Sequence, residues 1–370
     1  MMVEKRASDL YITAGLAPSL RIQGRSVAVD NQSLTPQKTR ELVLSVLNEE
    51  QRAEYTKNKE CNFAITAPNL GRFRVSAFQQ RNYSGMVVRR IESYIPTPEE
   101  LGLPEIVKEL ALAARGLVIL VGATGTGKSS SMAAMLGYRN RYGAGHIITI
   151  EDPIEFVHPH DGCIVTQREV GLDTESFEVA LKNSFRQAPD VVEIGEIRTA
   201  ETMDYALEFA ETGHLCIATL HANNAHQALD RIQHFFPQDR QAQVWTSLSL
   251  NLKAIMAQQL VPLVDGKNLV LATEVLVNTP IVADKIREGN VTELKEYMSR
   301  TNHVGMRTFD QSLYELYSQG KITEETALKY ADSSNNVRLL IKLAEEKIKE
   351  AGKSTQTLTL ARRGKLDDDE

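Results

Sequence analysis

Paired cysteines, long apolar runs and an excess of basic charge are all missing from this sequence of 370 residues. No apolar run approaches the length that a bilayer-spanning helix needs. The opening residues Met1-Met-Val-Glu-Lys-Arg also lack the apolar core of a signal peptide. We therefore expect a cytoplasmic protein without direct membrane insertion, whose association with a membrane depends on partners.

The three cysteines, Cys61, Cys163 and Cys216, lie far apart and form no C-x-x-C pair. This spacing excludes a cysteine-based zinc module and argues against a disulfide framework, so we expect three buried thiols. The formal net charge of −6 argues against a strongly basic nucleic-acid binder, although it is compatible with a local basic stripe. The apolar share of 42% is typical of a soluble globular protein, and the length allows two domains.

One motif organises the rest of the chain, because the segment from Gly122 to Ser129 fits G-x-x-x-x-G-K-[ST]. The β-branched run 117–121 before it predicts a buried strand, and 129–141 predicts a helix. Glycines let successive N–H groups face phosphate oxygens, and the helix N-terminus adds partial positive charge. Lys128 can reach the β- and γ-phosphates, and the Ser129 hydroxyl can ligate Mg²⁺. The predicted triphosphate-binding residues are Gly122, Ala123, Thr124, Gly125, Thr126, Gly127, Lys128, Ser129 and Ser130.

A domain boundary is expected at Ile95-Pro-Thr-Pro98, because each proline disfavours a helical conformation in the residue before it. Residues 1–94 alternate like half-buried strands around one helix that Thr35 and Pro36 open, which predicts a small α+β domain. From 116 to 280 strands alternate with helices, the pattern of a parallel sheet covered by helices. Residues 95–115 are a predicted linker with a lead-in helix, 281–350 a helical region and 351–370 a disordered acidic tail. The strands predicted in the second domain are 117–121, 146–150, 191–194, 215–219 and 269–277, and the later helices are 284–300, 308–319 and 336–350.

Acidic side chains follow two of these predicted strands, where ligands of open α/β sheets gather. Glu196 can hold the hydration shell of Mg²⁺ or orient water, unless it is a solvated glutamate in a loop. Glu151, Asp152 and Glu155 lie within one short acidic stretch and can present a general base toward the γ-phosphate. The sequence alone does not show which of these three carboxylates is the general base.

Histidines and arginines supply further candidates. His214 and His221 flank a predicted strand and could sense the γ-phosphate, whereas a lone histidine is more often structural. Arg72 and Arg74 share one face of a predicted strand because side chains alternate with period two. Such arginines are either solvated surface residues or arginine fingers that stabilise the charge on a transferred phosphoryl group. The first domain places five of them close together in sequence: Arg72, Arg74, Arg81, Arg89 and Arg90.

Taken in order, these groups resemble the motifs of the secretion ATPase superfamily, and within it the PilT/PilU family of type IV pilus retraction motors. The resemblance runs from Ser8-Asp-Leu-Tyr-Ile to Ile341-Lys-Leu. Beside the phosphate-binding loop it rests on an Asp-box stretch (150–156), a Walker B stretch (195–198) and a His-box stretch (212–221). The stretches 167–179 and 186–190 and the acidic end 367–370 resemble the PilU branch. The absence of a four-cysteine zinc module agrees with retraction rather than with extension or secretion.

The resemblance implies an α/β architecture, with a RecA-like P-loop domain, a small PAS-like α+β N-terminal domain and C-terminal helices. It implies that Glu155 is the general base and that Glu196 serves Mg²⁺ and water. The family's nucleotide-reaching arginines match Arg72, Arg74 and Arg89, and its histidines match His214 and His221. The helices that contain Ile286-Arg287 resemble a region linked to retraction.

Two positions depart from the family pattern. Thr199 follows Gly-Glu-Ile-Arg where many members have Asp, and Glu193 occupies a position that is usually apolar. Burial of Glu193 would raise its pKa unless it meets a cationic partner. This glutamate could weaken the Walker B strand or mark an unusual contact. Neither departure removes a predicted catalytic residue.

These features lead to the hypothesis of a homohexameric ATPase at the cytoplasmic face of the inner membrane, with ATP as substrate and Mg²⁺ as cofactor. ATP would bind between the two domains, and hydrolysis would move one against the other. The expected partners are a PilT-like paralogous motor, which this protein would assist in pilus retraction and twitching motility, and an inner-membrane platform protein. Two alternatives stay open. One is a P-loop nucleic-acid translocase, which the acidic balance disfavours, and the other is an ATP-binding docking partner with little hydrolysis of its own.

Overall fold

The computed structural model describes residues 1–68, 70–301 and 303–346, and these form two compact units. Unit one consists of Met1–Ile95 together with two later segments, Asp152–Pro159 and Gln167–Glu175. Unit two consists of Pro96–Glu151, His160–Thr166 and the residues from Ser176 onward. The predicted disordered tail at 351–370 lies outside the described residues.

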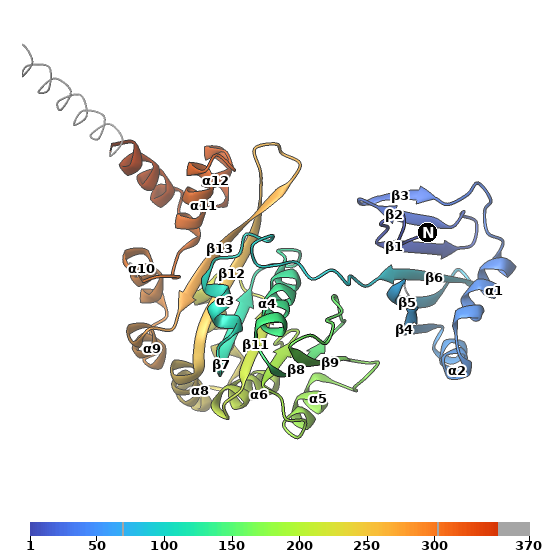
Figure 1. Cartoon of the computed structure of the whole chain (residues 1–370), viewed down its shortest axis with the longest axis horizontal. Helices are drawn as coiled ribbons and strands as arrows, with labels where there is room; N and C mark the ends of the chain where they lie inside the picture. Colours follow the sequence, from blue (N-terminus) through green and yellow to red (C-terminus); the bar gives the residue numbers. More distant parts are fainter. Residues whose placement is uncertain (69, 302, 347–370) are drawn as a thin grey trace, which may run out of the picture. The chain divides into compact units, whose positions relative to one another are not determined.

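Unit one contains one antiparallel sheet and two helices (Figure 1). Its elements are β1 (Asp9–Thr13), β2 (Ser19–Ile22), β3 (Arg25–Ala28), α1 (Pro36–Val46), α2 (Glu49–Asn58), β4 (Glu60–Ala67), β5 (Gly71–Gln80) and β6 (Tyr83–Arg90). The six strands lie in the order β3-β2-β1-β6-β5-β4. Apolar side chains of four strands pack on Val43 and Leu47 at α1 and on Tyr55 of α2, which forms the core of this unit.

Side chains of the preceding residues fix both helix starts in unit one. The predicted start at Thr35 and Pro36 is confirmed, since the Thr35 side chain accepts a hydrogen bond from the Lys38 N–H at 3.2 Å. The second helix, α2, was not predicted. Only one of its residues is buried, so the sequence lacks an apolar stripe there. Asn48 and Gln51 instead form a capping box that satisfies two backbone N–H groups.

The two later segments of unit one were assigned by the sequence pattern to the second domain. In the structure Phe156 forms a bridge with Glu92, and the Val157 N–H donates to the Glu92 carbonyl at 3.0 Å. The Ile154 N–H donates to the Glu169 carboxylate at 3.2 Å, which ties one segment to the other. Glu155, the predicted general base, therefore belongs to unit one.

The second sheet has seven strands in the order β13-β12-β7-β11-β10-β8-β9. Five strands were predicted and are confirmed, whereas β9 and β12 were not predicted. The expected parallel pairing holds for β8, β10, β11, β7 and β12, but β13 runs antiparallel to β12. The strands are β7 (Gly116–Val121), β8 (Gly145–Glu151), β9 (Cys163–Glu169), β10 (Val191–Ile194), β11 (Leu215–Leu220), β12 (Leu252–Pro262) and β13 (Leu269–Val277).

Helices of unit two pack against the sheet, and the last ones lie on its β13 side (Figure 1). They are α3 (Ile106–Ala111), α4 (Lys128–Tyr142), α5 (Phe177–Ser184), α6 (Ala200–Glu211), α7 (Ala225–Phe235), α8 (Gln238–Asn251), α9 (Pro280–Arg287), α10 (Thr292–Arg300), α11 (Phe309–Ser318) and α12 (Glu324–Tyr330). The single helix predicted over 284–300 is wrong. Gly289 has a φ of +69°, a conformation that ends α9 and separates it from α10. Of the predicted helix 336–350, residues 336–346 are helical, within a helix that begins at residue 334, and residues 347–350 lie outside the described residues.

The central strands of unit two are covered on both faces. All six residues of β7 and all six of β11 are buried, as expected for parallel strands between helical layers. Cys61, Cys163 and Cys216 are buried and unpaired, which confirms the prediction of three buried thiols. Within the described part of the chain, no helix has both the length and the hydropathy of a membrane span.

The capping box of α2 generates a stability prediction. Asn48→Ala should weaken the helix by about 1 kcal/mol, because it leaves a backbone N–H without its acceptor. Amide hydrogen exchange of residues 49–58 should then accelerate, and the matched change Asn58→Ala at the exposed far end of the helix should have a smaller effect. Equal acceleration in both variants would contradict this role of Asn48.

Candidate nucleotide-binding site

The predicted phosphate-binding loop connects β7 to α4 in unit two. Gly122 has a φ of +156°, and a Cβ built there would lie 2.7 Å from the Gln258 carbonyl oxygen of β12. Gly127 has a φ of +89° and is the N-cap residue of α4. A side chain at Gly122 would collide with backbone, and one at Gly127 would strain the left-handed conformation. The turn therefore requires glycine at both positions.

Lys128 is the first residue of α4 and is half-buried. Its Nζ donates hydrogen bonds to the carbonyl oxygens of Gly122 at 2.8 Å and Ala123 at 3.0 Å. Burial lowers the pKa of Lys128, and the nearby negative charge of Glu196 opposes that shift. The ammonium group thus lies at the loop, where it can contact a bound phosphate.

Glu196 and His221 meet at the same edge of the sheet. Glu196 follows β10, and its Oε1 lies 3.0 Å from His221 Nε2, while its Oε2 accepts a hydrogen bond from Arg198 at 2.8 Å. His221 follows β11. The two loops are joined further by the Ile197 N–H, which donates to the Thr219 carbonyl at 2.8 Å. The structure therefore brings together three sequence-predicted groups: the loop, Glu196 and His221.

A cavity of about 400 Å³ opens beside this group of residues. Gln227 and Arg231 of α7 line it, and the sequence analysis missed both. Their spacing of four places them on one face of the helix, and their position shortly after His221 is the signal that could have found them. Arg231 adds a cationic side chain to a cavity suited to a polyanion. The lining residues are Gly122, Ala123, His221, Ala222, Asn223, Gln227 and Arg231.

The donor set at this edge fits Mg²⁺. Ser129 is exposed at the second position of α4, and Glu196 is 16% exposed in its side chain. Hydroxyl and carboxylate oxygens are the ligands that Mg²⁺ prefers, together with phosphate oxygens and water. No group of three or more His, Cys, Asp or Glu residues suited to a metal occurs among the described residues.

Glu193 lies in the middle of β10 and is 4% exposed. Burial raises its pKa well above the ordinary glutamate value, and the negative charge of Glu151 raises it further. Thr149, which lies opposite Glu193 in the parallel register, donates a hydrogen bond to Glu151 Oε1 at 2.6 Å. Burial and the neighbouring carboxylate therefore both favour the protonated form of Glu193.

The predicted arginines lie on the sheet of unit one. Arg74 is directly opposite Arg89 in the register of β5 and β6, and Arg89 Nε donates to Asp9 Oδ1 at 2.7 Å. Asp9 is 2% exposed, so this ion pair also supports the sheet. The hydrogen bond to Asp9 is the main cause that raises the pKa of Arg89, and the negative charge of Glu155 adds a smaller contribution. Unit one thus brings Glu155 near Arg89.

Glu169 adds a carboxylate to the same unit. Burial raises its pKa, and the positive charges of Arg74 and Arg72 oppose that shift. Arg72 and Arg74 share a face of β5 by the strand period. The three predicted arginines, Glu155 and Glu169 therefore form one charged group within unit one. The sequence analysis did not predict that Glu169 belongs to it.

His214 lies away from the phosphate-binding loop of its own unit. It precedes β11, whereas His221 follows that strand, so about 20 Å of extended chain separates the two histidines. The His214 ring packs edge-on against Phe209, and its Nδ1 lies 3.2 Å from the Phe209 carbonyl oxygen. The structure does not bring His214 together with Lys128, and the role predicted for His214 stays a prediction.

A buried strand, a glycine loop, a helix that begins at Lys128, and an acidic residue after a neighbouring parallel strand together define a RecA-like P-loop fold. The chain belongs to a particular family with this fold. The family model described as "Type II/IV secretion system protein" matches residues 2–360.

Individual relatives agree with this family. The chain is 66% identical over 346 residues to the type IV pilus ATPase PilU of Pseudomonas aeruginosa, covering 94% of this chain and 91% of the relative. It is 39% identical to the type IV pilus retraction ATPase PilT of the same organism, covering 89% of this chain and 96% of the relative. A crystal structure of the pilus retraction motor PilT with bound ADP superposes with a TM-score of 0.83 at 41% identity, covering 90% of this chain and 95% of that one. Membership of this family implies ATP hydrolysis.

The buried acid of β10 generates a pH prediction. Because its folded pKa is raised, the native state holds the Glu193 proton more tightly than the unfolded chain, so stability falls as pH rises above the ordinary glutamate pKa of about 4.3. This contribution amounts to at most about 1.4 kcal/mol per pH unit. Glu193→Gln should remove it, and urea unfolding at several pH values measures the change. The exposed control Glu201→Gln should keep the wild-type slope, and an unchanged slope in Glu193→Gln would contradict the argument.

Proposed function

We propose that this protein is an ATP-hydrolysing motor that assists type IV pilus retraction and twitching motility. The observation that carries the proposal is the convergence of Lys128, Glu196 and His221 at one edge of the sheet. The proposal is supported by the 66% identity to a type IV pilus ATPase along 94% of the chain. A loop of this geometry binds phosphates through backbone N–H groups and a lysine.

In the proposed reaction, water attacks the γ-phosphorus of ATP and the bond to the bridging oxygen breaks, which yields ADP and phosphate. Lys128 would hold the β- and γ-phosphates through its Nζ, which already lies at the loop. Ser129 and Glu196 would hold Mg²⁺, which when bound neutralises the developing negative charge. The contact between His221 and Glu196 fixes the carboxylate, so His221 can respond to changes at the γ-phosphate.

The remaining catalytic roles fall to unit one. Glu155 would accept the proton of the attacking water, and Arg72, Arg74 and Arg89 would stabilise charge on the phosphoryl group. Because these residues belong to one unit and Lys128 to the other, we propose that turnover requires both units. Hydrolysis would then be coupled to motion of one unit against the other, the ordinary way in which a nucleotide drives a two-domain motor.

The proposed assembly is a homohexamer at the cytoplasmic face of the inner membrane. It would act beside a PilT-like paralogous motor on an inner-membrane pilus platform protein. The identities of 66% to PilU and 39% to PilT support a role distinct from that of PilT itself, as an auxiliary motor.

Two substitutions separate binding from chemistry. Lys128→Ala should lose nucleotide affinity, because its Nζ is the cation of the loop. Glu155→Gln should bind nucleotide normally yet lower phosphate release by about a hundredfold or more, since general-base catalysis contributes that much. Phosphate release and binding of a fluorescent ATP analogue measure the two effects. The matched controls Arg141→Ala and Glu175→Gln, both exposed, should retain activity, and unchanged turnover in Glu155→Gln would refute its assignment as the base.

The assembly and the need for a partner are tested by mass and rate. The purified protein should have the mass of six chains and should hydrolyse ATP at a rate that increases when the PilT-like motor is added. Nucleotide binding with phosphate release at background, alone and with the partner, would instead support the docking alternative. Salt-dependent DNA binding near physiological ionic strength would favour the translocase.

A further inference from the structure

Glu274 is a buried carboxylate in β13 with no part in the chemistry above. It is 2% exposed and lies opposite Ala257 of β12. Its Oε1 accepts a hydrogen bond from the Ala225 N–H at 2.9 Å, and the carboxylate also accepts one from the Phe309 backbone. A buried carboxylate is costly unless hydrogen bonds compensate it, so these two amides stabilise it there.

Both amides belong to the first residues of helices. Ala225 begins α7 and Phe309 begins α11. The first N–H groups of a helix have no partner within the helix, and the helix dipole places partial positive charge there. Glu274 therefore joins two helix N-termini that are far apart in sequence, through one carboxylate on the edge strand of the sheet.

The first of these helices is a wall of the nucleotide cavity. Gln227 and Arg231 of α7 line that cavity, and α7 begins directly after the loop that carries His221. Asn224 caps the helix through a hydrogen bond from the Gln227 N–H at 3.0 Å. The position of α7 consequently sets where Gln227 and Arg231 lie relative to the phosphate-binding loop.

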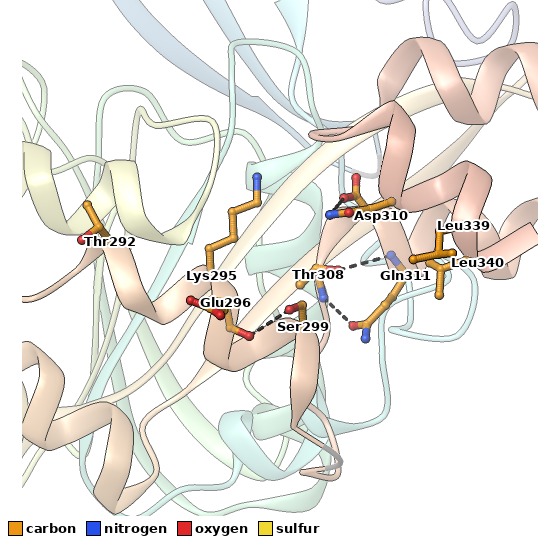
Figure 2. A pocket seen from close by; sticks show the side chains of 10 residues that line it. Thr292, Lys295, Glu296, Ser299, Thr308, Asp310, Gln311, Leu339 and Leu340 are labelled. Atoms are coloured by element: carbon orange, nitrogen blue, oxygen red, sulfur yellow. Dashed lines mark hydrogen bonds between the residues drawn. The ribbon is translucent and has the colours of Figure 1, made fainter. Parts of the chain in front are cut away.

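The second helix belongs to the C-terminal region. A separate cavity of about 510 Å³ is lined by residues of α10, α11 and the helix at 334–346. Figure 2 shows Lys295 of α10 among the side chains that line it. Lys295 Nζ lies 3.0 Å from Asp332 Oδ2.

Charged groups from three elements act on Glu274. The pKa of Glu274 is raised to about 7, mainly by burial and also by the negative charge of Asp332, while the amide hydrogen bonds and the positive charge of Lys295 oppose the shift. His226 of α7 faces the same cluster, where burial and Lys295 lower its pKa while Asp230 and Asp332 oppose the shift. His226 is thus neutral around neutral pH, whereas the charge of Glu274 changes there.

We propose that Glu274 is a positioning residue that holds α7 for nucleotide binding and makes nucleotide affinity depend on Lys295 of α10. The proposal rests on the proposed function, because it assigns the cavity beside the loop to ATP. Lys295 lines the C-terminal cavity and not the nucleotide cavity. Its charge acts on the start of α7 through Glu274 and also on His226, and the double-mutant cycle below isolates the part that passes through Glu274.

The test is a double-mutant cycle in the full-length protein, with binding of a fluorescent ATP analogue in the presence of Mg²⁺ as the readout. Lys295→Met should weaken binding by about fivefold, the size of a modest coupling between sites. Glu274→Gln should weaken it at least as much, because an amide offers one acceptor oxygen in place of a carboxylate. Adding Lys295→Met to Glu274→Gln should then have no further effect. The matched control Lys342→Met, an exposed lysine of the helix at 334–346, should bind as the wild type does.

A pH series provides a readout that a purely structural role would not change. The wild type should bind the analogue more weakly at about pH 6 than at about pH 8, because protonation of Glu274 removes its charge from both helix starts. Glu274→Gln should lose this difference, because its side chain does not titrate. The difference between the two pH profiles then isolates the contribution of Glu274.

Three outcomes would overturn the proposal. The first is an equal effect of Lys295→Met in both backgrounds, and the second is the same pH profile in Glu274→Gln and the wild type. The third is wild-type affinity in Lys295→Met, which decides the matter even if Glu274→Gln fails to fold. A wild-type protein that binds no nucleotide at all would instead refute the proposed function, so the two failures are distinguishable.

Discussion

Parallel pairing of β8, β10, β11 and β7 is the constraint on which the candidate site depends. Leu220 pairs with Val121, and Ile194 pairs with Ala218, so neighbouring strands end at nearly the same level. The chain therefore leaves each strand at one edge, where the backbone turns and functional side chains meet. A shift of one residue in this register would separate Glu196 from His221.

The local part of this arrangement was predictable from the sequence. The glycine loop, its strand and its helix form one continuous stretch of sequence, so their pattern can be recognised without knowledge of the fold. Glu196 and His221 could be placed at the edge because each follows a strand with an apolar, β-branched sequence. The helix start at Thr35 and Pro36 was likewise predictable, because threonine favours the N-cap and proline the first helical position. In each case the information lies within a few residues of the feature.

Features that depend on residues far apart in sequence were not predictable. The bridge between Phe156 and Glu92, which places Glu155 in unit one, leaves no periodic signal in either segment. Glu193 and Glu274 each interrupt an apolar strand, and the sequence cannot say what compensates the burial. In the structure the burial of these two glutamates is compensated in different ways. Burial and the nearby Glu151 favour the protonated form of Glu193, whereas Glu274 receives amides from two helices.

The carboxylate of Asp310 repeats the pattern of Glu274 further along the chain, since it accepts a hydrogen bond from the Ser333 N–H at 3.1 Å just before the helix at 334–346. Both acids hold a helix by its backbone, and every residue except proline offers the same amide. The residues that follow such an attachment can change without loosening it. Substitutions on the outer faces of the C-terminal helices would therefore leave their attachment to the sheet of the nucleotide site in place.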